Sequence, residues 1–316
     1  MKRFLIMLCI LGLALSGCAK PANEAVTTPT LKIAVIPVID TLPLFVAQAE
    51  GLFEKNNLKV ELVPVASAPE RDQVLLAGKV DGVLNESLAV MLFNKEKIQL
   101  QAVRYGLMAS EGAGHFFILA SGQSKIKDVN GLKGVEIGIS QGTIVEYVTT
   151  RLLEGQGFSG DDIKTMAVPK IPDRMSLLAS GGINAAVMPD PLAALAVQQG
   201  ASILLDDSSN PKLGASILSF RKEVIDSQPG AIKAFLAAVE TAVEMINANP
   251  QKYSNILAEQ KIVPQPLIGK YVIPKFPLKG VPSEAEWNDV LTWAKTKNIL
   301  STDISYNDSV NATYLP

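Results

Sequence analysis

Two stretches of the chain share one pattern of hydrophobic and polar positions. The first, PERDQVLLAGKVDGVLNES, covers residues 69–87, and the second, PDRMSLLASGGINAAVMPD, covers residues 172–190, 103 positions further along. In each copy a proline and an acidic residue open a predicted helix, apolar positions continue it, and a glycine in the left-handed C′ position ends it. A short apolar strand follows, at 80–84 or at 183–188. This duplication predicts two similar lobes that hold something between them.

Short apolar runs alternate with helical patterns before and between the two copies. The predicted strands lie at 31–37, 58–65, 100–105, 135–139, 163–168 and 202–205. The predicted helices between them lie at 43–55, 88–94 and 144–154. Regular alternation of strand and helix predicts an α/β fold in which each lobe is a mostly parallel sheet flanked by helices.

Two further apolar runs connect the predicted lobes. HFFILA, at 115–120, is predicted to cross to the second lobe, and GASILSF, at 214–220, is predicted to return. The chain after residue 220 is then predicted to be helical and to pack on the first lobe, with an apolar stripe at 229–247 and a capping box of Ser283 and Glu286. We therefore assign residues 31–118 and 219–316 to lobe one and residues 119–218 to lobe two, with the two crossovers as a hinge.

The N-terminus carries the pattern of a targeting signal. Lys2 and Arg3 precede an apolar run at 4–15, which is too short for a stable membrane-spanning helix and ends in Leu15-Ser16-Gly17-Cys18. This ending resembles the lipobox of bacterial lipoproteins. We predict that residues 1–17 are a lipoprotein signal peptide that is removed.

Cys18 would then be the first residue of the mature chain and would carry the lipid, including palmitate. Cys9 lies inside the segment that is removed, so Cys18 has no partner for a disulfide. Residues 18–30, polar and with two prolines, are predicted to be a flexible tether. The alternative is a plain cleavable signal in which the cysteine is incidental.

Composition and charge narrow the possible functions. The 316 residues are 48% hydrophobic and carry a formal net charge of −2 with scattered lysines and arginines, which argues against nucleic-acid binding. The mature chain offers a single histidine, His115, besides Cys18, so a zinc or iron site lacks ligands. No nucleophile elbow or phosphate-binding loop is present. We predict no metal, no cofactor and no catalytic residue, with His115 as a hydrogen-bonded histidine of the hinge or cleft.

The loops directly after the predicted strands form the candidate site, because ligands of open α/β sheets bind beyond the carboxyl ends of the strands. Several of these loops lead straight into helices, whose free N–H groups favour anionic or carbonyl oxygens. The candidate ligand-binding residues are Asp40, Thr41, Leu42, Ser67, Ala68, Asn85, Glu86 and Ser87 in lobe one and Ser140, Gln141, Gly142, Thr143 and Asp190 in lobe two. The alternative for Thr41, Ser67 and Thr143 is that their hydroxyls only cap helices.

The chain resembles a known family over residues 31–220. The segments that carry the resemblance are DTLPLFVAQAEGLFEKNNLKVELVPV, PERDQVLLAGKVDG, GISQGT and PDPLAALAVQQGA. They resemble the substrate-binding lipoproteins of ABC importers, in particular the group that binds nitrate, sulfonates, taurine or pyrimidine precursors of thiamine. The resemblance implies a two-lobed type II periplasmic-binding-protein fold that closes on a solute. It also implies that residues 140–143 and the loops after the lobe-one strands face the cleft.

The resemblance leaves the ligand open. Basic and acidic candidates near the rim are equal in number, with Arg71, Arg104 and Arg174 against Asp40, Glu86 and Asp190. Carboxylates in a cleft favour a ligand with hydrogen-bond donors, such as an amine or a pyrimidine-like heterocycle. Such a ring could stack on Phe45, Tyr105 or Tyr147, and we include Tyr105 and Tyr147 among the candidate ligand-binding residues. The alternative ligand is an aliphatic sulfonate, taurine or nitrate.

The resemblance also implies partners and location. We expect an extracytoplasmic receptor, anchored by its lipid to a bacterial membrane, that acts as a monomer and delivers a small-molecule solute to an ABC permease and its ATPase subunit. An enzyme of the pyrimidine-synthesis type is an alternative, but such relatives depend on a cysteine cluster and an intracellular location, and this chain has neither. A sensory lipoprotein is a further alternative. We predict that the protein is not an enzyme.

Overall fold

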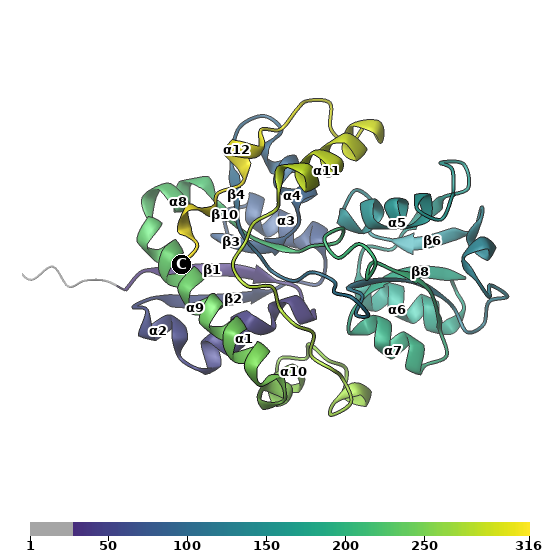
Figure 1. Ribbon diagram of the computed structural model, residues 1–316, viewed down its shortest axis with the longest axis horizontal. Coiled ribbons are helices and arrows are strands. Elements are labelled where there is room, and N and C mark those ends of the chain that lie inside the picture. Colours follow the sequence, from purple (N-terminus) through teal and green to yellow (C-terminus); the bar gives the residue numbers. More distant parts are fainter. Residues whose placement is uncertain (1–27) are drawn as a thin grey trace, which may run out of the picture.

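Two five-stranded sheets organise the computed structural model, which describes residues 28–316 (Figure 1). The predicted signal peptide and Cys18 lie outside the described residues. The first sheet has the order β2-β1-β3-β10-β4, formed by Lys59–Pro64, Thr30–Val35, Gly82–Asn85, Ile217–Arg221 and Leu100–Tyr105. The second has the order β7-β6-β8-β5-β9, formed by Lys164–Ala167, Glu136–Ile139, Ala185–Pro189, Phe116–Ala120 and Ser202–Asp206.

The two sheets have equivalent topologies. In the first, β1 pairs in parallel with β2 and β3, and β10 is antiparallel to both of its neighbours. In the second, β6 pairs in parallel with β7 and β8, and β5 is antiparallel to both of its neighbours. Each sheet therefore has four strands in one direction and one in the other. The predicted two-lobed α/β fold with mostly parallel sheets is confirmed.

The duplicated stretch occupies the same place in both lobes. Helix α3 (Ala68–Leu76) leads to β3, and helix α6 (Ile171–Ser180) leads to β8. The two helices and the two strands each begin 103 positions apart, as the sequence pattern predicts. Gly78 and Gly181 have φ angles of +66° and +75°, which confirms the left-handed glycine at the end of each helix.

Of the remaining helices of the two lobes, two agree with the sequence pattern, one was not predicted, and one prediction is wrong. Helix α4 (Ser87–Asn94) follows β3, α5 (Ile144–Glu154) has the predicted bounds, and α7 (Leu192–Gln198) follows β8. The single helix predicted at 43–55 is wrong, because the structure has α1 (Leu42–Ala49) and α2 (Leu52–Lys55) there. Gly51, with a φ of +65°, separates them in a conformation that no helix interior can contain.

The two segments that join the lobes run side by side. The runs predicted as crossings are themselves largely strands, β5 in the second sheet and β10 in the first, and the connecting segments precede each of them. These segments are hydrogen-bonded, from Gly106 N–H to Ser216 O at 2.7 Å and from Ser216 N–H to Leu107 O at 2.9 Å. The hinge therefore consists of two connecting segments that are hydrogen-bonded to each other.

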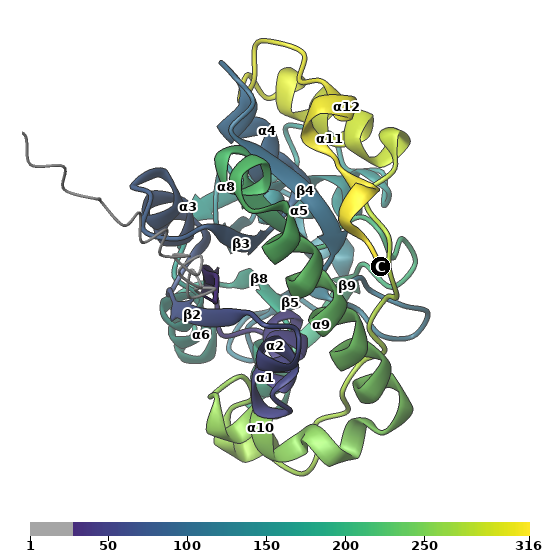
Figure 2. The same ribbon diagram turned by 90° about the vertical axis from the view of Figure 1, so that its left-hand side faces the viewer.

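The chain after β10 packs on the first lobe (Figure 2). Its helices are α8 (Lys222–Ser227), α9 (Pro229–Ala248), α10 (Ser254–Glu259), α11 (Glu284–Thr296) and α12 (Tyr306–Ser309), with 3-10 turns η3 (Pro250–Tyr253), η4 (Gln265–Leu267) and η5 (Ala312–Tyr314). Helix α9 lies against α1 and α2, where Phe235 stacks on Phe53 with ring centroids 5.5 Å apart. The predicted capping box of Ser283 and Glu286 opens α11.

This C-terminal segment also contacts lobe two, at two places on its rim. On α11, Asp289 accepts hydrogen bonds from Tyr147 Oη at 2.5 Å and from Arg151 Nη2 at 2.6 Å, both on α5. After η4, Tyr271 Oη donates to Asp190 Oδ2 at 2.8 Å. The C-terminal segment therefore joins the two lobes outside the hinge.

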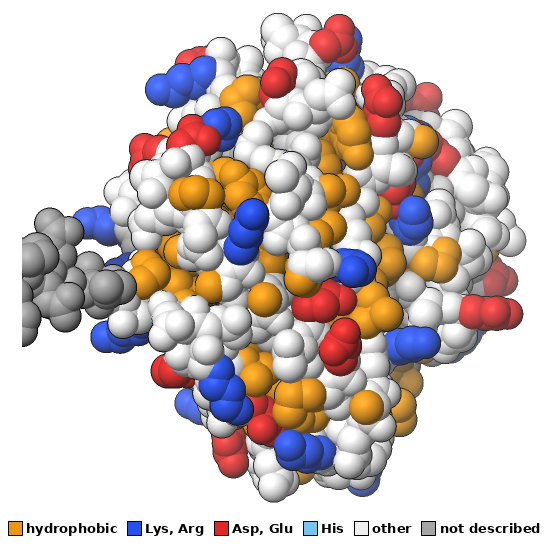
Figure 3. Space-filling view, turned by 60° about the vertical axis from the view of Figure 1, so that its left-hand side comes forward, with side chains coloured by type: hydrophobic (Ala, Val, Ile, Leu, Met, Phe, Trp, Pro, Cys, Tyr) orange, Lys and Arg blue, Asp and Glu red, His pale blue; other side chains and the backbone are white. Residues whose placement is uncertain are grey.

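The surface in Figure 3 carries acidic and basic side chains interspersed with apolar ones, so this face has no extended basic stripe. None of the helices within residues 28–316 combines the length and the apolar composition needed to span a bilayer.

Candidate functional site

A cavity of about 70 Å³ lies between the two lobes. The loops after β1 and β3 and helix α3 line one side. The loops after β6 and β7, the end of β8 and the first turns of α5 and α6 line the other. The hinge closes it with His115, Phe116, Gly214 and Ser216. The cavity therefore lies at the carboxyl ends of the strands, where the sequence pattern places the candidate site. Residues 28–316 contain no cluster of three or more His, Cys, Asp or Glu side chains placed to hold a metal ion.

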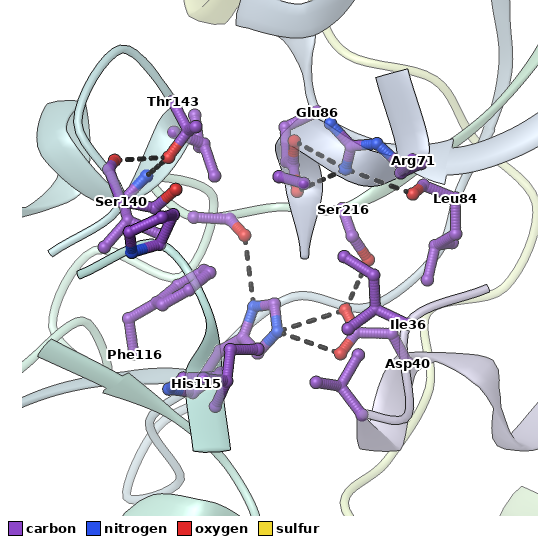
Figure 4. Close-up of a pocket in the computed structure, with 18 of the residues that line it drawn as sticks. Ile36, Asp40, Arg71, Leu84, Glu86, His115, Phe116, Ser140, Thr143 and Ser216 are labelled. Carbon is purple, nitrogen blue, oxygen red and sulfur yellow. Dashed lines mark hydrogen bonds and ion pairs between the residues drawn. The ribbon is translucent and has the colours of Figure 1, made fainter. Parts of the chain in front are cut away.

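His115 and Asp40 form a buried ion pair where the hinge meets lobe one (Figure 4). The Nδ1 atom of His115 lies 3.1 Å from Gly214 O, and its Nε2 atom lies 3.1 Å from Asp40 Oδ1. Ser216 Oγ donates to Asp40 Oδ2 at 2.6 Å. Burial opposes the charge on His115, but Asp40 outweighs it and raises the pKa of His115 to about 9. Both ring nitrogens then donate, so His115 is an imidazolium paired with a carboxylate.

Asp207 and Gly214 hold the hinge side of the cavity in place. Asp207 Oδ1 accepts the backbone N–H groups of His115 at 2.7 Å and of Phe116 at 3.1 Å, which fixes the start of β5. Burial raises the pKa of Asp207. A Cβ atom on Gly214 would lie 2.5 Å from the Phe116 ring and 2.9 Å from Asp207 Oδ2, so no larger residue fits at that position.

Arg71, on α3 of lobe one, is buried and ion-paired with two carboxylates. Its Nη1 atom lies 3.2 Å from both carboxylate oxygens of Glu86 and 3.3 Å from Leu84 O, and its Nε donates to Asp72 at 2.8 Å. Burial opposes the charge on Arg71, but Glu86 and Asp72 outweigh it and raise the pKa of the guanidinium. Burial raises the pKa of Glu86, and Arg71 opposes that shift. Lobe one thus presents a neutralised arginine to the cavity.

Arg174, on α6 of lobe two, occupies the equivalent position but lacks these partners. It is 1% exposed, its Nη1 donates to Val168 O at 2.9 Å, and its buried Nε has no hydrogen-bond partner. No carboxylate of residues 28–316 lies within ion-pairing distance of it. Burial alone lowers the pKa of Arg174 to about 10. The cavity therefore contains a buried positive charge without a counter-charge.

Ser140 and Thr143 extend this side of the cavity. Ser140 Oγ is buried and has no hydrogen-bond partner. Thr143 Oγ1 accepts from Val145 N–H at 3.2 Å, which caps α5, and donates to Ser140 O at 2.7 Å. Figure 4 shows Ser140 and Thr143 on the side of the cavity opposite Arg71 and Glu86. Lobe two thus offers two buried donors without a hydrogen-bond partner, the Ser140 hydroxyl and the Nε–H group of Arg174.

The structure brings five of the predicted residues together at the cavity, namely Asp40, Ala68, Glu86, Ser140 and Thr143. Ser87, Tyr105 and Tyr147 instead line a neighbouring cavity of about 270 Å³ beneath α11. There the hydroxyls of Tyr105 and Tyr147 bond to Glu286 and Asp289 of α11. Asp190 lines a third hollow together with Tyr271.

The other predicted residues lie beside the cavity without lining it. Thr41 Oγ1 donates to Val38 O at 2.7 Å, Leu42 is buried in the core, and Ser67 accepts from Glu70 N–H at 3.3 Å as the cap of α3. Asn85 Oδ1 accepts from Ser219 Oγ at 2.7 Å. Gln141 bonds to Thr165, and Gly142 forms the turn before α5 with a φ of +70°. Ser67 and Thr143 therefore act as helix caps, whereas Thr41 does not cap its helix.

Four residues whose place the sequence left open are now located. Arg71, Arg174 and His115 line the cavity, whereas Arg104 pairs with Glu240 at 2.9 Å on lobe one and does not. Phe116 lines the cavity with its aromatic ring, whereas Tyr105 and Tyr147 do not. The sequence analysis did not identify Phe116 as a site residue. Its position directly after His115, at the start of β5, was the available signal.

Comparison with known proteins gives concordant matches. Residues 24–259 match the NMT1-like family. A "putative thiamine biosynthesis protein" of Haemophilus influenzae is 27% identical over 67% of each chain. A "putative aliphatic sulfonates-binding protein" of Bacillus subtilis is 26% identical over 81% of this chain and 79% of the relative.

Solved structures match the fold. The alkanesulfonate-binding protein SsuA from Xanthomonas axonopodis pv. citri, bound to MOPS, has a TM-score of 0.75 at 16% identity. The match covers 89% of this chain and 98% of the SsuA chain. The desulfurization enzyme DSZB also matches, with a TM-score of 0.66 at 14% identity, over 90% of this chain and 97% of its own. The same two-lobed fold thus occurs in binding proteins and in an enzyme.

Proposed function

The chain belongs to the NMT1-like family, and on that premise we propose that it is the solute-binding receptor of an ABC importer and captures a small anion between its lobes. The fold, the position of the cavity at the carboxyl ends of the strands, and relatives named as binding proteins support the receptor function. The buried charge of Arg174, which has no counter-charge, is the observation that favours an anionic ligand.

The charges around the cavity favour an anion over an amine. A buried, unpaired guanidinium is costly, and a ligand that supplies the missing negative charge removes that cost. The carboxylates of Asp40 and Glu86, which would have to receive an amine, are already bonded to His115 and Arg71. Of the two ligand classes that the sequence left open, the geometry therefore supports the sulfonate, taurine or nitrate class better than the amine or pyrimidine class. The small volume, about 70 Å³, favours a compact group at Arg174.

Isothermal titration calorimetry with simple compounds tests this proposal. We expect at least one of methanesulfonate, acetate and nitrate to bind and, at saturating concentration, to raise Tm by roughly several degrees. Cytosine and ethylammonium, as neutral and cationic controls, should neither release heat nor shift Tm. Binding of cytosine or ethylammonium without binding of any anion would reject the anionic class.

The geometry favours binding over catalysis. Both ring nitrogens of His115 are engaged, so the imidazole has no free lone pair to act as a general base. The described residues offer no cysteine, since Cys9 and Cys18 both precede residue 28. We therefore propose that the protein is a non-enzymatic receptor. From its resemblance to importer receptors we further propose that it is a monomer outside the cytoplasm, which hands its solute to a permease and its ATPase subunit.

We also propose that Cys18 anchors the receptor to the membrane. The order of basic, apolar and small residues before Cys18 supports this, as does the polar stretch that follows it. Radiolabelled palmitate should be incorporated by cells that express the full chain. A Cys18→Ala variant should incorporate none and should be released as a soluble protein. Equal labelling of both chains would contradict the anchor.

A further inference from the structure

The structure assigns a second role to Glu86, in addition to holding Arg71. We propose that Glu86 sets the charge of the solute. Its carboxylate lines the cavity and, with Asp72, balances Arg71, so that Arg174 alone remains uncompensated among the lining cations and the receptor selects singly charged anions over doubly charged ones. This inference rests on the proposed function, since it concerns which anion the same cavity accepts.

The duplication makes the comparison of the two lobes direct. Arg71 and Arg174 lie 103 positions apart on equivalent helices, and both are 1% exposed. The partners of Arg71 are Glu86, which lines the cavity, and Asp72. The positions 103 residues after them are Pro189 and Met175, which carry no charge. Two equivalent arginines therefore face one cavity, and only the lobe-one arginine has carboxylates.

The charges that line the cavity leave room for one negative charge. His115 is paired with Asp40 and Arg71 with Glu86, which leaves Arg174 as the lining cation without an ion-pair partner among residues 28–316. The first negative charge of a ligand would be balanced by Arg174. A second would have no cation to balance it and would face the carboxylates of Glu86 and Asp40, where the low dielectric of a buried site strengthens the repulsion. Repulsive elements of this kind are a common source of specificity.

Glu86 is not needed simply to keep Arg71 buried. Arg71 Nε already pairs with Asp72 at 2.8 Å, and Arg71 Nη1 also donates to Leu84 O at 3.3 Å. Arg174 remains buried on α6 with a single backbone acceptor, so the fold accepts an arginine at this position without a carboxylate. The carboxylate of Glu86 thus changes the charge of the cavity without being required for the burial of the arginine.

Calorimetry with methanesulfonate as the monoanion and sulfate as the dianion tests the proposal in the full mature chain. In the unmodified protein methanesulfonate should bind and sulfate should bind at least tenfold more weakly. In Glu86→Gln the ratio of the sulfate Kd to the methanesulfonate Kd should fall by at least tenfold, because the lost carboxylate repels a dianion about twice as strongly as a monoanion. Glu61→Gln, which removes an exposed carboxylate on β2, is the matched control and should leave the ratio unchanged.

A reciprocal variant keeps the test decisive if Glu86→Gln does not fold. Pro189→Glu places a carboxylate beside Arg174 at the position equivalent to Glu86, and it should weaken methanesulfonate binding at least tenfold. An unchanged sulfate to methanesulfonate ratio in Glu86→Gln, or full methanesulfonate binding by Pro189→Glu, overturns the role of Glu86 and leaves the receptor function intact. Failure of the unmodified protein to bind methanesulfonate, acetate, nitrate and sulfate overturns the anionic ligand class itself, and this inference with it.

Discussion

Arg174→Met should weaken anion binding at least about a hundredfold while making the ligand-free protein more stable. Binding is weakened because the substitution removes both a charged hydrogen bond to the ligand and the one lining cation of residues 28–316 that has no counter-charge. The expected loss of binding free energy is about 3 kcal/mol. The gain in stability follows because a buried, unpaired charge is replaced by an apolar side chain of similar length. We expect the free energy of unfolding to rise by about 1–3 kcal/mol, after allowing for the lost bond to Val168 O. Calorimetry and urea unfolding measure the two effects separately.

Arg71→Met is the matched control, because it changes the equivalent residue of the other lobe. It leaves the carboxylates of Glu86 and Asp72 without their cation, so the free energy of unfolding should fall by about 3–5 kcal/mol. The two substitutions are chemically identical and should act on stability with opposite signs. If both destabilised the protein to the same extent, Arg174 would have a counter-charge in solution and the argument for an anionic ligand would fail.

Raising the pH from 6.5 to about 9 should destabilise the protein by on the order of 3 kcal/mol through His115 alone. The pKa of His115 is raised in the folded state, from 6.5 to about 9. Its contribution is therefore fully present below pH 6.5 and is lost as the pH rises through about 9. In that window the folded protein binds a proton that the unfolded chain has released. His115 is the only histidine of the chain, so no other imidazole contributes.

His115→Gln isolates this effect. Urea unfolding of both proteins, measured at intervals between pH 6 and pH 9.5, should give a sloping stability profile for the unmodified chain and a nearly flat one for the variant. Burial raises the pKa values of Asp190 and Asp207, and both carboxyls are present in both proteins. A profile with the same slope in both would show that His115 is not the titrating group.

The sequence predicted the elements with strong periodicity and could not place the residues that depend on distant segments. Strand β4 and helix α5 have the predicted bounds, because a compact apolar run and an apolar stripe define each of them locally. The burial of Arg71 and Arg174 could not be read in the same way. An arginine on a helix is usually exposed. These two are buried and donate to backbone carbonyls at the end of β3 and directly after β7.

Tyr105 and Tyr147 show that sequence patterns also could not place site residues that depend on distant segments. They were predicted as aromatic rings on which a pyrimidine-like ligand could stack. Helix α11, more than 135 residues further along, brings Glu286 and Asp289 to their hydroxyls, and no local pattern signals such a contact. Asp40, Glu86, Ser140 and Thr143 were predicted to lie at the cleft because their loops directly follow strands, and the structure places all four at the cavity.

The bonds that join the C-terminal segment to lobe two have a consequence for how tightly the receptor holds its solute. Tyr147 and Arg151 bond to Asp289, and Tyr271 bonds to Asp190, all outside the cavity. Separation of the lobes breaks these bonds, so they favour the closed conformation whichever solute is bound. Since apparent affinity scales with the fraction of molecules in the binding-competent conformation, the rim shifts that population and affects all solutes equally. The contacts between the C-terminal segment and lobe two therefore adjust affinity, and the charges of the cavity determine selectivity. A substitution in one of these places can change its property while the other is preserved.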